Sequence, residues 1–103
     1  MRLPSFGKAI RRNRKLAGMG VQDLARCLTD GDHAVAALAA EPSPVQVLQR
    51  LERSGTWPYD DDAVWQDFIV KCAGCLAHGN TARERVVLFE LVQRASLDLA
   101  MGS

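Results

Sequence analysis

The fold of this chain is decided by residues 6–28, FGKAIRRNRKLAGMGVQDLARCL. In the first half of this stretch, apolar residues recur at the spacing of one helix face, and basic residues fill the positions between them. We therefore predict a helix that begins near Ser5 and ends at Gly18, followed by a second helix over about Val21 to Leu28. The residues expected to face inward are Phe6, Ala9, Ile10, Leu16, Leu24 and Leu28.

The rest of the chain is also predicted to be helical, with Gly, Pro and Asp marking the breaks. A third helix is expected over about Asp32 to Ala40, and a fourth over Pro44 to Ser54. A long fifth helix follows the acidic cap Asp60 to Asp62 and ends at His78, and Thr81 then caps a sixth. We therefore predict an all-α fold, a compact bundle of about five to six helices with no strand.

The length and composition of the chain suit one compact domain, since it has 103 residues and 48% hydrophobic content. Within it, we expect residues 1–55 to form the functional part and residues 56–103 a C-terminal helical hairpin. No run is apolar over the roughly 20 residues that span a bilayer, and no secretory signal is seen. We therefore expect a cytoplasmic protein with no membrane partner. Its three cysteines, an odd number, predict reduced thiols and no disulfide.

The charges of the chain are separated along the sequence, although the net charge is only +1. Residues 1–29 hold seven basic residues and one acidic residue, a net charge of +6. Residues 30–62 hold seven acidic and two basic residues, a net charge of −5. A basic first quarter is typical of a surface that faces a polyanion, although a solvated helix face would give the same pattern.

A series of short motifs runs through residues 6–55. They are Gly7-Lys8-x-Ile10-Arg11-x-x-Arg14-Lys15-x-x-Gly18-Met19, then Asp23-Leu24-Ala25, then Val35-x-x-Leu38, then Pro42-Ser43 followed by Leu48 and Leu51. In this order and spacing they resemble the lambda-repressor-like (Cro, or xenobiotic-response-element) helix-turn-helix domain. The resemblance covers about half of the chain.

The resemblance implies that the helix over 32–40 enters a major groove of DNA, while the preceding helix braces it on the backbone. It places some residues at phosphates and others at bases. The implied DNA-binding residues are Arg11, Arg14, Lys15, Val21, Gln22, Asp32, His33, Ala36 and Ala37. A competing alignment makes residues 44–55 the recognition helix, with Gln46 and Arg50 toward the bases, at the cost of about a dozen inserted residues.

The last helix carries more apolar residues than one buried face requires. Spare apolar surface indicates a partner, most simply a second copy. The residues expected at this dimer interface are Leu88, Leu91, Val92, Ala95 and Leu99. The function that follows is a sequence-specific DNA-binding regulator acting as a homodimer, a small repressor of the phage, plasmid or toxin–antitoxin type. The alternative is a protein-interaction module that keeps the same scaffold.

The run Cys72-Ala73-Gly74-Cys75 followed by His78 has the residue types of a metal site, which Cys27 and His33 could complete. The same cysteines could instead form a redox pair, or continue an apolar helix stripe as buried hydrophobes. We favour the buried stripe and expect no metal and no cofactor. Since the sequence contains no nucleophile–base cluster and no phosphate cradle, we do not expect an enzyme.

Overall fold

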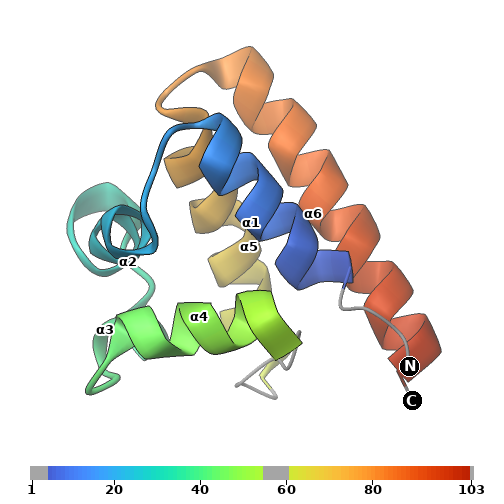
Figure 1. Ribbon diagram of the computed structural model, residues 1–103, viewed down its shortest axis with the longest axis horizontal. Coiled ribbons are helices and arrows are strands. Elements are labelled where there is room, and N and C mark those ends of the chain that lie inside the picture. The colour runs from blue at the N-terminus through green and yellow to red at the C-terminus, as the bar shows by residue number, and fades with distance from the viewer. Residues whose placement is uncertain (1–4, 55–60, 103) are drawn as a thin grey trace.

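The computed structural model describes residues 5–54 and 61–102. It contains six α-helices and one 3₁₀ turn, and the described residues include no strand, so the all-α prediction is confirmed. The elements are α1 (Ser5–Leu16), α2 (Val21–Thr29), η1 (Gly31–His33), α3 (Ala36–Ala39), α4 (Pro44–Ser54), α5 (Asp62–Ala77) and α6 (Thr81–Gly102). Figure 1 shows α6 running along one side of α1 and α5, with α2 on the other side and α4 below.

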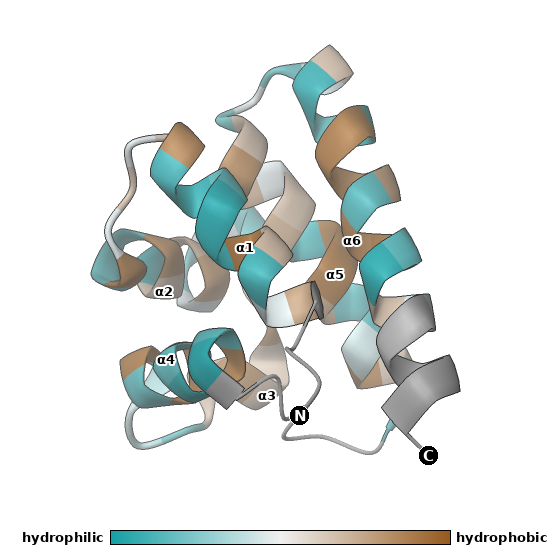
Figure 2. Cartoon of the chain, turned by 45° about the vertical axis from the view of Figure 1, so that its right-hand side comes forward, coloured by the Kyte–Doolittle hydropathy of each residue, from teal (hydrophilic) through white to brown (hydrophobic). Residues whose placement is uncertain are grey.

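The centre of the bundle is α5, which packs against α2, η1 and α6. Its residues from Cys72 to Ala77 are all buried, which an amphipathic helix at the surface could not achieve. Helix α1 is different, because hydrophilic residues cover its outer side (Figure 2), while Phe6, Ala9 and Ile10 face the core. The fully buried side chains of the core include Ile10, Leu24, Leu28, Leu38, Leu48, Leu51, Phe68, Leu76, Val87 and Leu91.

Most of the inward positions predicted for α1 and α2 are confirmed, since Phe6, Ala9 and Ile10 are at most 4% exposed and Leu24 and Leu28 are fully buried. The prediction for Leu16 is wrong, because its side chain is 67% exposed. Leu16 is the last residue of α1, and the chain turns away there before the core can cover it.

Among the residues that the structure describes, no helix has the length and apolarity needed to cross a bilayer.

The predicted third helix over 32–40 is wrong in its first half. Residues 31–33 form the 3₁₀ turn η1, Ala34 and Val35 are extended, and only Ala36–Ala39 are α-helical. The backbone N–H of Val35 donates to the carbonyl of Leu28 at 2.7 Å, and the Val35 side chain is 1% exposed. Burial of Val35 and this hydrogen bond thus outweigh the high helix propensity of the alanines around it.

The ends of α5 follow the sequence prediction more closely. The Asp61 carboxylate accepts a hydrogen bond from the Ala63 N–H at 2.8 Å, as expected for an N-cap, and Asp60 lies outside the described residues. His78 ends the helix in the left-handed region at φ 52°. The cap of α6 is Asn80 and not Thr81, because the Asn80 side-chain oxygen accepts from the Arg83 N–H at 3.0 Å.

Candidate functional site

The outer side of α1 carries three exposed cations: Lys8, Arg11 and Lys15. They follow one another at spacings of three and four residues, which place them on one stripe of the helix opposite Phe6, Ala9 and Ile10. Their side chains make no ion pair with any described residue. Among the described residues, therefore, nothing neutralises the positive charge of this stripe.

A hollow of about 400 Å³ lies beside this stripe, where α1, the start of α2 and α4 meet. Four of the residues that line it are basic and one is acidic. The lining residues are Lys8, Arg11, Arg14, Val21, Gln49, Glu52 and Arg53. The hollow thus gathers cations from α1 and α4 around one helix N-terminus.

Arg14 and Glu52 form a nearly buried ion pair at the base of this hollow, with side chains 14% and 9% exposed. The guanidinium donates from Nε and Nη2 to the two carboxylate oxygens, both at 2.9 Å, and from Nη1 to the Met19 carbonyl at 3.0 Å. The hydrogen bond to Glu52 raises the pKa of Arg14, although burial acts the other way. Glu52 therefore neutralises Arg14, whereas Lys8, Arg11 and Arg53 form no ion pair within the part of the chain that the structure describes.

Gly7 lets α1 and α4 come close enough to form this pair. A Cβ atom at Gly7 would collide with the carbonyl oxygen of Leu51 and with the backbone of Glu52. Backbone atoms cannot swing aside as a side chain can, so any larger residue would push the helices apart. The glycine of the Gly7-Lys8 motif thus has a packing role.

The N-terminus of α2 lines the same hollow through Val21. The Asp23 carboxylate accepts from the Gly20 N–H at 2.9 Å, which occupies one donor at this end. The N–H groups of Val21 and Gln22 lie in the first turn, where no intrahelical acceptor exists. They are therefore available to an anion, beside the cations of α1 and α4.

The residues predicted to read bases do not share one helix face. Asp32 and Ala36 are exposed and Ala37 is half-buried, but Asp32 belongs to η1 and the two alanines to α3. His33 packs inward against α5, where Gly74 leaves space for its ring. The structure therefore brings Arg11, Arg14 and Val21 together with Arg53 of α4, whereas His33 lies against Gly74 of α5.

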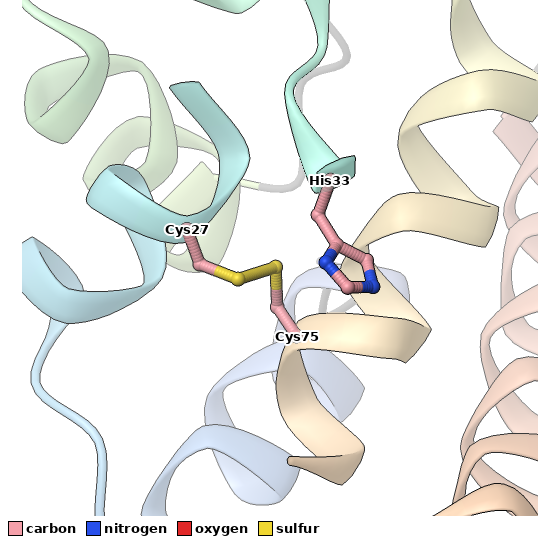
Figure 3. Close-up of side chains that lie close together, drawn as sticks. All are labelled: Cys27, His33 and Cys75. Carbon is pink, nitrogen blue, oxygen red and sulfur yellow. A yellow bond between two sulfur atoms is a disulfide. The ribbon is translucent and has the colours of Figure 1, made fainter. Parts of the chain in front are cut away.

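The sulfur chemistry of the chain differs from the prediction of reduced thiols. Cys27 of α2 and Cys75 of α5 form a disulfide, with Cα atoms 6.1 Å apart, so that prediction is wrong. Figure 3 shows the ring of His33 beside the bonded sulfurs, with one ring nitrogen turned toward Cys75. The ligand atoms of Cys27, His33 and Cys75 all lie within 4.8 Å of one another. No sequence motif links Cys27 to Cys75, since 48 positions separate them.

The predicted run Cys72, Cys75 and His78 is not a site. Cys72 is free and fully buried, and burial raises the pKa of its thiol to about 12. His78 lies at the exposed end of α5, with its Nε2 3.1 Å from the Ala17 carbonyl oxygen. The expectation that Cys72 is a buried hydrophobe is therefore confirmed, whereas Cys75 has a different partner.

The apolar surface of α6 also differs in its residues from the prediction. Leu91 and Ala95 are at most 1% exposed and belong to the core of the same chain, so neither is available to a partner. Leu88 is half-buried, Val92 is 46% exposed, and the side chain of Leu99 lies outside the described residues. The most exposed large apolar side chains are Leu16, Val86 and Phe89, beside a second hollow of about 400 Å³ between α1 and α6.

Comparison of the chain with protein-family models, curated proteins and solved structures finds no match in any of the three.

Proposed function

We propose that the chain is a DNA-binding regulator that grips the phosphate backbone of duplex DNA at the hollow between α1, α2 and α4. The observation that carries the proposal is the gathering of Lys8, Arg11 and Arg53 around the free N–H groups at the start of α2. Phosphates bind such a combination because cations supply attraction and the helix N-terminus supplies aligned donors. Lys15 extends the same charge along α1.

The resemblance to helix-turn-helix proteins supports duplex DNA over other polyanions. In that family the segment after the second helix of the domain approaches the major groove, and the free N–H groups at the start of the second helix suit a phosphate. Here the following segment is η1 and α3, in which Asp32, Ala36 and Ala37 remain as the candidates for base contacts. We propose that Arg14 acts by fixing α1 on α4 and not by contacting DNA, because Glu52 already occupies its guanidinium.

The proposed regulator acts as a homodimer, and the exposed apolar patch of Leu16, Val86 and Phe89 is the surface that supports a second copy. A patch on antiparallel helices can meet its own copy across a two-fold axis. Replacement of Phe89 by Glu, compared with the Ser96→Glu control on the same helix, is expected to convert a dimer into a monomer in analytical ultracentrifugation. A chain that is already monomeric at high concentration would remove the homodimer from the proposal.

The test of DNA binding is a titration of labelled duplex from immediately upstream of the chain's own gene, against scrambled duplex of equal length, over a series of salt concentrations. Each phosphate contact contributes about 0.9 to the slope of log affinity on log salt. The variants Lys8→Glu and Arg11→Glu are expected to weaken binding and to lower that slope by about one each. The control is Arg85→Glu, the same charge change at an exposed position of α6 that does not line the hollow.

Unchanged binding in the α1 variants would mean that DNA binds at another surface. Equal weakening in the α6 control would mean that the variants only reduce a nonspecific electrostatic attraction. No binding even at low salt would favour the second candidate, a protein-interaction module. The observation in favour of that candidate is the same exposed patch of Leu16, Val86 and Phe89. It predicts that Phe89→Glu abolishes capture of a protein partner while Lys8→Glu leaves it unchanged.

A further inference from the structure

The cluster of Cys27, His33 and Cys75 brings three potential metal ligands to one place from three different elements, α2, η1 and α5. All three ligand atoms lie within 4.8 Å of one another, and no other group of three in the described chain meets this criterion. Two thiolates and one imidazole are the ligand types that zinc prefers. Of the five cysteines and histidines that the sequence suggested as ligands, the structure brings these three together and leaves Cys72 and His78 outside the group.

The position of His33 requires a specific feature of α5. The imidazole occupies the space that a side chain at residue 74 would fill, because a Cβ there would lie 2.5 Å from Nε2 and 2.6 Å from Cδ2. Glycine inside a helix costs about 1 kcal/mol relative to alanine. Here the missing Cβ lets the ring lie directly beside Cys75, so the site depends on a residue that is otherwise unfavourable in a helix.

His33 is also available as a ligand. Its side chain is half-buried, and its ring makes no hydrogen bond to any residue that the structure describes. A structural histidine packed beside a helix usually satisfies at least one ring nitrogen. Figure 3 shows one nitrogen directed at the sulfurs, where a cation between the three residues would lie.

We propose that the dithiol form of this chain binds a zinc ion through the sulfur atoms of Cys27 and Cys75 and a ring nitrogen of His33. Zinc–sulfur bonds of about 2.3 Å at a tetrahedral angle hold two sulfurs about 3.8 Å apart. The sulfurs reach that separation by side-chain rotation once their bond is broken. Water takes the fourth position, since Cys27 and His33 are only half-buried.

Two balanced steps connect the disulfide to the metal site. A dithiol reductant gives two electrons and its two thiol protons to the sulfur–sulfur bond and becomes a disulfide. A phosphine gives two electrons, and one water molecule supplies the two protons for the thiols and the oxygen of the phosphine oxide. Zinc then displaces the two thiol protons to the solvent, and no further electrons move. The disulfide and the zinc complex are therefore mutually exclusive states of one cluster.

The proposal is tested on the full chain, reduced with a phosphine and freed of it under anaerobic conditions. Cobalt(II) serves as the spectroscopic probe, because thiolate-to-cobalt charge transfer and tetrahedral d–d bands report sulfur ligation, and competition with zinc then gives the zinc affinity. We expect one equivalent to bind. His33→Asn is expected to weaken binding at least about 100-fold, since even residues that only orient metal ligands change affinity 10- to 100-fold.

The matched controls are His78→Asn, the only other histidine, and Cys72→Ala, the only other cysteine, which should both leave binding unchanged. Gly74→Ala is a further variant, expected to reduce affinity by displacing the ring while the disulfide still forms on oxidation.

The absence of cobalt bands in the reduced chain would overturn the proposal and leave the disulfide as a structural bond. Equal affinity of His33→Asn and the unmodified chain would also overturn it. The readout is metal uptake, so failure of DNA binding does not affect this test.

Discussion

The close approach of His33 to Gly74 predicts how the stability of the fold responds to one added methyl group. In Gly74→Ala the new Cβ would lie 2.5 Å from Nε2, whereas ordinary contacts begin at 3.4 Å, so the ring must move by about 0.9 Å. Alanine itself favours the helix by about 1 kcal/mol. Overpacking in a buried site costs about 1–3 kcal/mol, so the substitution should be neutral or destabilising in the unmodified chain. In a His33→Ala background, the same substitution should stabilise the fold by about 1 kcal/mol.

The assay is a double-mutant cycle of urea unfolding on the oxidised chain, so that the disulfide is present in all four proteins. The structure predicts a coupling energy between residues 33 and 74 of at least about 1 kcal/mol, within the range found for residues in contact. Substitutions without contact add within about 0.3–0.5 kcal/mol. If Gly74→Ala stabilised both backgrounds by the same amount, the ring would not occupy the space beside Gly74, and the geometry of the metal proposal would fail with it.

Four other outcomes follow from the described contacts. Burial raises the pKa of Cys72 from 9.0 to about 12. At about pH 8 the folded thiolate fraction is therefore about a thousand-fold lower than in the unfolded chain, and mass spectrometry should find Cys72 alkylated only on unfolding. Because this pKa is raised, the associated stability is present below the pKa of the unfolded chain and is lost as pH rises from 9 toward 12, a loss that Cys72→Ala should abolish. Reduction of Cys27–Cys75 releases a loop of 48 positions and should lower the free energy of unfolding by about 4 kcal/mol, whereas an unchanged urea midpoint would contradict this. Replacement of Glu52 by Ala leaves the Arg14 cation nearly buried and should cost about 3 kcal/mol, against less than about 1 kcal/mol for Asp67→Ala, whose Lys71 pair is more exposed.

The helices that the sequence predicts well are those with a regular apolar pattern and clear end signals. The bounds of α4, Pro44–Ser54, match the prediction, and Asp61 caps α5 as expected. The error at 32–40 has a different origin, because alanine-rich sequence favours a helix only when no tertiary contact competes. There the burial of Val35 and the packing of His33 on Gly74 determine the backbone conformation, and neither contact can be recognised from the neighbouring sequence.

The contacts at the candidate sites were also hard to predict, because they join residues far apart in the sequence. The basic stripe of α1 was predictable because Lys8, Arg11 and Lys15 share a helix face at a known spacing. The capture of Arg14 by Glu52 was not, since it joins residues 38 positions apart. The cysteine run 72–75 suggested a local pair, but Cys72 is fully buried and Cys75 meets Cys27 of α2. A single glycine inside α5 was the one sequence signal that could have pointed to a close neighbour there.

The disulfide divides the oxidised chain into a covalent ring, residues 27–75, and two tails that contain α1 and α6. The two tails pack on each other through α1 and α6. Glu90 of α6 forms an ion pair with Arg12 and accepts a hydrogen bond from the Asn13 amide at 2.8 Å. A single cut of the backbone anywhere between Cys27 and Cys75 therefore opens the ring but releases no fragment. After such a cut, the Cys27–Cys75 disulfide still joins the two pieces covalently. They can separate only when the disulfide is also reduced.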